Sequence, residues 1–420
     1  MVDTQKIHIQ SIGSGGDGIG KDENGKSWYI PATFPDEIVE ASYVAPRGKG
    51  VAGKAISIEK QSKYRQKELC KHANNCGGCS LQHMQDSFYK NWQIEMIKNI
   101  LAQNGLNAEV NHVFQAEKNS RRRAIFHICH EEDGVKVGFY NSFSQNVECI
   151  SDCLILDAKL KEIIPELEEL FIKILKPRKK AEASVTLCEN GLDILLKFPK
   201  KLKTSAKEVL ADYSDNKWVR LATQITDDEP TTVLWQKEEP CVKFGKTLVP
   251  VAIGGFLQAT KSGEKAIVSA VIDGVSSSDN ILELFAGNGT LTLPLLENGK
   301  AVTAVELNSD SLRMLKKGAK EYANNLSIVE KNLFTESYST NELNNFDCVV
   351  LDPPRAGAKK QIEVISTTKI PKIVMASCNI KTFAQDSRIL VDAGYDLENI
   401  SIIDQFLWTP HVEVVGIFTR

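Results

Sequence analysis

The chain has 420 residues, of which 42% are hydrophobic and 25% charged, proportions typical of a globular protein with two or three domains. No apolar run approaches the roughly 20 residues that span a bilayer, and the first ten residues lack the layout of a secretion signal. We therefore expect a cytoplasmic, monomeric protein with no membrane association. The net charge is −3, which excludes a uniformly basic nucleic-acid binder, so any such contact must use local basic patches.

Residues 1–60 have the pattern of a small β-barrel. Short strands are predicted at 7–10, 27–31 and 38–43, and glycine-rich turns such as GSGGDGIG at 13–20 lie between them. This pattern fits a five-stranded barrel of the OB type, which often binds nucleic acid. A barrel that only packs against its neighbour would have the same pattern.

Residues 61–235 have the mixed pattern of a central α+β domain. Helices are predicted at 84–106 and 156–175, and strands at 124–128, 135–140 and within 185–198. From residue 236 to 420 strands and helices alternate, which predicts a Rossmann-like, doubly wound domain. Its strands are expected at 281–285, 301–306, 348–352, 373–377, 400–405 and 413–418, and its helices at 265–272, 309–323, 360–365 and 381–393. The last two strands are too close for a crossover helix, so one of them should run antiparallel. The predicted fold class is multidomain α/β.

A turn that follows the first strand of the C-terminal domain is the candidate cofactor site. The sequence Glu283-Leu-Phe-Ala-Gly-Asn-Gly-Thr290 has two glycines that let a ligand approach the backbone, although a plain structural turn could read the same. The spacing is not G-x-G-x-x-G, which disfavours a dinucleotide. Glu306 ends the next strand, where a carboxylate can accept hydrogen bonds from both hydroxyls of a ribose. Together they predict a nucleoside cofactor.

Three later strands carry chemically reactive residues at their ends. One strand ends in Asp352-Pro-Pro-Arg355, with arginine where amino-group methyltransferases place an aromatic residue. The next ends in Cys378, just before a helix whose N-terminus is expected to favour the thiolate. Glu413 interrupts an apolar stretch, so burial should raise its pKa and suit it to proton transfer. Cys378 could instead be a core cysteine, and Glu413 a glutamate on the solvent face of a strand. We favour catalysis because these residues are expected at the same edge of the sheet as the glycine turn.

These groups suit methylation of carbon 5 of a uracil. That carbon is too weak a nucleophile to attack a methyl sulfonium unaided, but addition of the Cys378 thiolate to carbon 6 would produce a reactive enolate. Glu413 would then remove the carbon 5 proton, and elimination would release Cys378. Asp352 would hold the uracil edge or bind the amine of the cofactor.

A cluster of cysteines precedes the first predicted helix. Cys70-x5-Cys76-x2-Cys79 forms a short loop, and Cys153 is the candidate fourth ligand, with Cys149 as its rival. The pattern suits a [4Fe–4S] cluster or zinc, and spacing alone does not decide between them.

Three features could contact RNA. The arginine triplet at 121–123 and the basic run KPRKK at 176–180 could contact phosphates, and either could be a solvated face instead. Phe256 could stack on a base, and Gln258 could bind cofactor or base.

In order, the motifs C-x5-C-G-G-C, F-L-Q, LFAGNGT, D-P-P-R-x-G, S-C-N and T-P-H-V-E resemble the RNA uracil-5-methyltransferase family, over essentially the whole chain. The resemblance implies Cys378 as nucleophile, Glu413 as general base, and an S-adenosylmethionine site formed by Gln258, Phe285, Thr290, Glu306, Asn332 and Asp352. It also implies a [4Fe–4S] cluster on Cys70, Cys76, Cys79 and Cys153.

The resemblance further implies that residues 1–60 are a TRAM domain and that the helix at 84–106 packs on the methyltransferase domain. A barrel together with a cluster is most similar to the branch that acts on 23S ribosomal RNA. Thr290, Thr260 and Ile380 depart from residues usual in the family, which bears on the substrate branch more than on the chemistry. Transfer RNA as substrate, an amino-group methyltransferase and a non-catalytic RNA-binding protein are the alternatives.

Overall fold

The computed structural model describes residues 4–213, 218–226 and 229–420. Two compact units account for the chain. The N-terminal unit consists of Met1–Asn99, Asn141–Ser144 and Trp408–His411, and the C-terminal unit of Ile100–Tyr140, Gln145–Leu407 and Val412–Arg420. None of the helices in the described part of the chain has the length and apolar character needed to cross a membrane.

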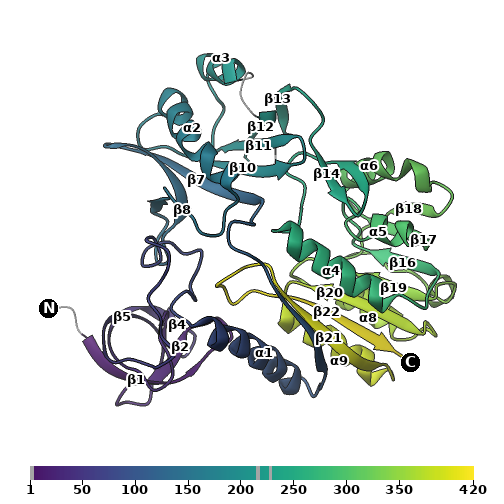
Figure 1. The fold of residues 1–420 in the computed structure, drawn as a ribbon, viewed down its shortest axis with the longest axis horizontal. Coiled ribbons are helices and arrows are strands. Elements are labelled where there is room, and N and C mark those ends of the chain that lie inside the picture. Colours follow the sequence, from purple (N-terminus) through teal and green to yellow (C-terminus); the bar gives the residue numbers. More distant parts are fainter. Residues whose placement is uncertain (1–3, 214–217, 227–228) are drawn as a thin grey trace. The chain divides into compact units, whose positions relative to one another are not determined.

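The N-terminal unit contains a closed β-barrel in the strand order β1-β2-β3-β5-β4, visible in purple in Figure 1. Its strands are β1 (Thr4–Ile12), β2 (Gly18–Lys21), β3 (Ser27–Ile30), β4 (Ile38–Arg47) and β5 (Gly50–Lys60). Alternate apolar residues such as Ile7, Ile9 and Trp28 fill its interior, as expected for strands with one buried face. Glu37 is buried and accepts hydrogen bonds from Arg65, which ties the barrel to the following segment. Helix α1 (Asp86–Gln103) begins in this unit.

An antiparallel-rich sheet of seven strands in the C-terminal unit has the order β13-β12-β11-β10-β7-β8-β9. The strands are β7 (Arg123–Glu131), β8 (Gly134–Tyr140), β9 (Val147–Cys149), β10 (Lys180–Cys188), β11 (Gly191–Phe198), β12 (Trp218–Ile225) and β13 (Thr232–Gln236). Helix α2 (Ala158–Ile174) packs its apolar face on this sheet, and α3 (Thr204–Asp212) packs beside it. The helix and strands predicted between residues 124 and 198 are thereby confirmed.

The second sheet of the C-terminal unit has eight strands in the order β18-β17-β16-β19-β20-β22-β21-β6. They are β6 (Glu109–Gln115), β16 (Asn280–Leu284), β17 (Ala301–Glu306), β18 (Leu326–Glu330), β19 (Cys348–Leu351), β20 (Lys372–Ser377), β21 (Asp396–Asp404) and β22 (Glu413–Thr419). Strand β22 runs antiparallel to both of its neighbours, as the short connection before it predicts. The central strand β19 is apolar and buried along its whole length because helices cover both faces of the sheet.

The helices of this second sheet lie on its two faces (Figure 1). They are α4 (Lys261–Gly274), α5 (Thr292–Glu297), α6 (Ser309–Gly318) with the 3-10 turn Ala319–Tyr322, α7 (Thr340–Leu343), α8 (Lys359–Ile365) and α9 (Ile380–Asp392). A hairpin of β14 (Cys241–Phe244) and β15 (Thr247–Pro250) precedes them. The six strands predicted after residue 236 are all present.

Two strands of this sheet were not predicted. β18 is short and mostly half-buried, so its sequence carries a weak pattern. β6 lies far upstream in the chain and pairs in parallel with β21, a long-range contact that local periodicity does not report. The residues that follow α1 also join this unit, where the Gly105 carbonyl accepts a hydrogen bond from Arg388 of α9. The boundaries near residues 60 and 235 stay predictions.

Candidate active site

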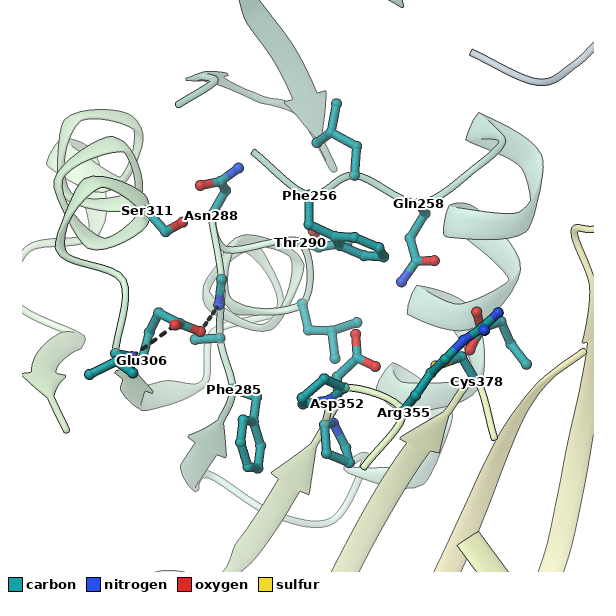
Figure 2. A pocket seen from close by; sticks show the side chains of 18 of the residues that line it. Phe256, Gln258, Phe285, Asn288, Thr290, Glu306, Ser311, Asp352, Arg355 and Cys378 are labelled. Carbon is teal, nitrogen blue, oxygen red and sulfur yellow. Dashed lines mark hydrogen bonds between the residues drawn. The ribbon is translucent and has the colours of Figure 1, made fainter. Parts of the chain in front are cut away.

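A cavity of about 620 Å³ opens at the carboxyl ends of the parallel strands of the eight-stranded sheet, a size usual for small-molecule sites. It lies within the C-terminal unit. All eight residues predicted for catalysis and cofactor binding line it: Gln258, Phe285, Thr290, Glu306, Asn332, Asp352, Cys378 and Glu413. Figure 2 shows Glu306 and Ser311 at one end of the cavity and Asp352, Arg355 and Cys378 at the other. We refer to these as the nucleoside end and the thiol end.

Glu306 at the nucleoside end is held by the backbone. One carboxylate oxygen accepts hydrogen bonds from the N–H groups of Leu307 and Asn308, both at 2.8 Å, and the other accepts from Gly287 at 3.1 Å. Three charge-assisted bonds fix the side chain and leave lone pairs for further donors. The predicted role of accepting hydrogen bonds from a ribose is consistent with this geometry.

Replacing Glu306 with alanine is expected to weaken S-adenosylhomocysteine binding by roughly ten- to a hundredfold, because charged hydrogen bonds contribute about 1.5–3 kcal/mol each. Isothermal titration calorimetry measures this directly. Glu330→Ala is the matched control, since Glu330 pairs with Glu306 on the neighbouring strand and does not line the cavity. Equal affinity for the Glu306→Ala and wild-type proteins would contradict the assignment.

The turn after β16 holds its backbone in a demanding conformation. Phe285 has φ +65°, a left-handed value that is unusual for a non-glycine residue and is often found at functional sites. At Gly289 (φ +93°) a Cβ would lie 2.5 Å from the end of the Leu315 side chain, so a larger residue would force Leu315 to move as well as straining the backbone. Glycine is therefore favoured at 289 by packing as well as by conformation.

Asn288, between the two glycines, shows that the cavity suits a polar ligand. Its side chain is 4% exposed, and neither its amide nitrogen nor its oxygen has a hydrogen-bond partner among the described residues. A buried amide without partners is unfavourable, so a bound molecule with donors and acceptors is expected to satisfy it. The residues present therefore fit a nucleoside cofactor that carries polar groups.

The structure places Cys378 as predicted, between β20 and α9, where Asn379 caps the helix with its side chain. Asn379 also donates a hydrogen bond to the Arg355 carbonyl at 2.9 Å, which joins the S-C-N and D-P-P-R segments. The expectation of a thiolate is wrong for the ligand-free protein. Burial, together with the carboxylates of Glu413 and Asp352, raises the pKa of the Cys378 thiol to about 11 and outweighs the helix N-terminus.

Two carboxyl groups at the thiol end have raised pKa values. Glu413 is 4% exposed at the start of β22, and burial followed by the charge of Asp352 raises its pKa to about 8. Burial raises the pKa of Asp352 to about 6. Near neutral pH, Glu413 is thus poised between its acid and base forms, as its position in an apolar stretch predicted.

In the arginine triplet at 121–123, the middle residue is buried and the outer two line the cavity. Arg122 is 2% exposed, pairs with buried Glu264 and donates to the Gln258 carbonyl at 3.0 Å, so the prediction that it contacts phosphate is wrong. Arg121 and Arg123 line the cavity, and Arg123 lies over the ring of Phe256, which is 65% exposed. These groups form a basic and aromatic rim.

The predicted metal site is not supported by the structure. Within residues 4–213, 218–226 and 229–420, no three histidine, cysteine, aspartate or glutamate side chains are gathered as a metal site requires. Cys70, Cys76 and Cys79 are half-buried in the N-terminal unit, and Cys153 is buried in the C-terminal unit. A backbone N–H of Gly78 donates to the Cys76 sulfur at 3.4 Å, the kind of contact that also stabilises a thiolate.

Among the residues in or beside the cavity that the sequence did not indicate, three bear on its chemistry. Asn288 lies inside the glycine turn and could have been noticed as an amide in an otherwise small-residue motif. In the sequence, Arg355 served only to disfavour amino-group methylation, because it stands where an aromatic residue would be expected. In the structure it lines the thiol end of the cavity. Gln405 ends a predicted strand, and nothing in the local pattern indicates its contacts.

The sequence model of the tRNA (uracil-5-)-methyltransferase family matches residues 253–420. An uncharacterized RNA methyltransferase of Caulobacter vibrioides is 33% identical over 427 residues, covering 99% of this chain and 100% of the relative. The 23S rRNA (uracil(1939)-C(5))-methyltransferase RlmD of Histophilus somni is 27% identical over 425 residues, covering 98% and 95%.

Among solved structures, the fold is similar to that of the tRNA (uracil-54, C5)-methyltransferase of Pyrococcus abyssi in complex with S-adenosyl-L-homocysteine. The TM-score is 0.73 at 20% identity, and the match covers 99% of this chain and 100% of the other. At this identity the likeness shows a shared fold.

Proposed function

Because this chain belongs to the RNA uracil-5-methyltransferase family, we propose that it transfers a methyl group from S-adenosylmethionine to carbon 5 of a specific uridine. The observation that carries the proposal is a single cavity with two chemically distinct ends. The nucleoside end offers the fixed carboxylate of Glu306, and the thiol end offers a nucleophile beside two carboxyl groups with raised pKa values.

When bound, S-adenosylmethionine supplies a methyl group on an electrophilic sulfonium. Glu306 would hold its ribose, and Gln258, Phe285, Thr290, Asn332 and Asp352 would complete its site. Asn332 already uses its side-chain oxygen to accept the N–H of Phe334 at 3.0 Å, so its amide nitrogen remains the group suited to a cofactor acceptor.

Cys378 acts on the uracil. Its thiol loses its proton to solvent and the sulfur forms a bond to carbon 6. The carbon 5–carbon 6 double bond becomes an enolate, and carbon 5 takes the methyl group, whose former sulfonium sulfur would keep the bonding electrons as a neutral thioether. The Glu413 carboxylate then accepts the carbon 5 proton, the carbon 6–sulfur bond breaks, and the double bond and thiolate are restored. Arg355 favours the reactive form of the nucleophile, since its charge lowers the pKa of the Cys378 thiol.

Ribosomal RNA is the proposed substrate class, and 23S rRNA the proposed molecule. The support is the RlmD relative, which is covered over 95% of its length. A transfer RNA uridine is the second candidate, because the family model that matches residues 253–420 describes tRNA methyltransferases. The barrel, which we propose is a TRAM domain, offers exposed Tyr43 and an arginine, Arg47, over the ring of Tyr29 for RNA contact.

The test is a map of 5-methyluridine in ribosomal and transfer RNA from a strain that lacks the gene. Loss of one site in 23S rRNA, restored by the purified protein and S-adenosylmethionine, is the expected result. Loss of a site in transfer RNA alone would replace the first candidate with the second. If no 5-methyluridine is lost from either RNA class, the proposed reaction is wrong.

We also propose that Cys70, Cys76, Cys79 and Cys153 bind a [4Fe–4S] cluster, a proposal that rests on their spacing and on the family resemblance. Protein purified without oxygen is expected to be brown and to contain about four iron and four sulfide per chain. A Cys76→Ser variant should lose both, whereas Cys241→Ser, in strand β14 and outside the four proposed ligands, should keep them. Bound zinc without iron would favour the zinc alternative. A protein that contains neither zinc nor iron would refute the metal site.

A further inference from the structure

Gln405 joins two residues of the candidate active site without lining the cavity itself. Its amide nitrogen donates to Oε1 of Glu413 at 3.0 Å and to Oε1 of Gln258 at 2.6 Å. Its amide oxygen accepts the backbone N–H of Ala259 at 2.9 Å. All three side chains are 4% exposed or less, so these bonds are shielded from water.

The hydrogen bond from Ala259 determines how the Gln405 amide is oriented. A backbone N–H can only donate, so the group that faces it must be the amide oxygen of Gln405. The two N–H bonds of the amide then point to Glu413 and Gln258. Flipping the amide would place its NH₂ group against the Ala259 N–H, lose that hydrogen bond and leave a buried donor unpaired.

This orientation has a consequence for each partner. Since an N–H donates to Oε1 of Glu413 and a carbonyl oxygen is the better acceptor, the contact favours Oε2 as the oxygen that carries the exchangeable proton. Since Oε1 of Gln258 is also occupied, its amide nitrogen is the group presented to a ligand, and Figure 2 shows this nitrogen turned toward the cavity.

The fold holds Gln405 in place from two sides. It follows β21 directly, where β6 pairs with the strand end and Ala116 donates its N–H to the Asp404 carbonyl at 2.8 Å. Helix α4 approaches so closely that a Cβ on Gly263 would lie 2.7 Å from the Cβ of Gln405. The absence of a side chain at residue 263 therefore makes room for Gln405.

We propose that Gln405 is a positioning residue that couples the general base to the cofactor site, by setting which oxygen of Glu413 exchanges the proton and which end of Gln258 meets the cofactor. This role rests on the proposed function, since it assigns proton transfer to Glu413. Gln405 itself touches neither substrate nor cofactor.

The charges around Glu413 determine whether its pKa rises or falls when Gln405 is replaced. Asp352 raises the pKa of the Glu413 carboxyl, whereas Arg355 and the hydrogen bond from Gln405 lower it, and the Cys378 thiol faces the same group. Removing the donor while the other groups stay must raise the pKa of Glu413. More of it would then be protonated at a given pH, and less would be available as a base.

Two measurements that need no RNA test the proposal. Infrared difference spectroscopy follows the Glu413 carboxyl against pH, with its band identified by its loss in Glu413→Gln. Calorimetry measures the affinity for S-adenosylhomocysteine. In Gln405→Met the carboxyl is expected to titrate at higher pH than in the wild type, and the cofactor analogue to bind roughly tenfold more weakly.

Two further variants separate hydrogen bonding from structure. Gln405→Glu keeps an oxygen that accepts the Ala259 N–H but loses the N–H donors to Glu413 and Gln258. It should therefore raise the pKa of the Glu413 carboxyl as well. Gln93→Met is the matched control, because Gln93 is a buried glutamine whose amide donates to Tyr89 outside the cavity. It should lower the melting temperature without changing the pKa of Glu413 or the affinity for S-adenosylhomocysteine.

The proposal is overturned if both Gln405 variants titrate like the wild type and bind S-adenosylhomocysteine equally well. Should Gln405→Met fail to fold, Gln405→Glu and Gly263→Ala decide the matter, since the added methyl group displaces Gln405 from α4. A wild-type protein that methylates no uridine would refute the proposed function instead, and the two RNA-free measurements would still report on Gln405.

Discussion

Replacing Cys378 with alanine is expected to abolish both methylation and the covalent adduct that the wild-type protein forms with RNA containing 5-fluorouridine. Fluorine at carbon 5 cannot be removed as a proton, so elimination stops and the carbon 6–sulfur bond persists. Loss of a catalytic nucleophile typically costs about 10⁴-fold or more in kcat. Denaturing electrophoresis detects the adduct, and mass spectrometry of a digest locates the modified cysteine.

Cys241→Ala is the control for this experiment. Cys241 is also a half-buried thiol of the C-terminal unit, but it lies in β14 and does not line the cavity. It should form the adduct at the wild-type rate. An adduct on the Cys378→Ala protein, or none on the wild type with an RNA that it methylates, would refute the nucleophile assignment.

Replacing Glu413 with glutamine is expected to lower kcat by about 10²- to 10⁴-fold, because the carbon 5 proton loses its acceptor. Methyl transfer precedes proton removal, so the variant should complete one transfer and remain attached to natural RNA. Labelled methyl groups on a protein–RNA species that survives denaturation are the readout. Glu398→Gln, an exposed carboxylate in β21, should turn over normally.

The pH dependence of product release follows from the same carboxyl. With the pKa of Glu413 raised to about 8, the fraction present as carboxylate increases as the pH rises through 8. Release of methylated RNA should therefore fall about tenfold for each pH unit below 7. In Glu413→Gln this dependence should disappear. A release rate in the variant that keeps the wild-type acidic limb would mean that another group accepts the proton.

Much of the candidate site could be predicted from the sequence because its residues sit at strand ends. In a parallel sheet the carboxyl ends of the strands meet at one edge, so Glu306, Asp352 and Cys378 converge whenever the strands are correctly placed. The structure brings all eight predicted catalytic and cofactor residues into one cavity. No such rule applies to the four predicted cluster cysteines, because they lie on loops rather than at strand ends of one sheet and belong to both units.

Errors arose where burial or long-range contact decides the outcome. Arg122 looked like a phosphate contact in a basic triplet, but it lies just before β7 and its side chain is buried against Glu264. The Cys378 thiol was expected to ionise near a helix N-terminus, but desolvation and two carboxyl groups have the larger effect. β6 was not predicted because its partner, β21, is almost 300 residues away in the chain.

The sequence by itself determined the alternation of elements, the spacing of the motifs and therefore the class of reaction. Each of these is a local property, set by the period of apolar residues and by the residue that ends each strand. Only the tertiary structure decided the raised pKa values of Cys378 and Asp352 and the hydrogen bonds of Gln405. Those depend on how much water surrounds each group and on which distant residues face it, and packing alone sets both.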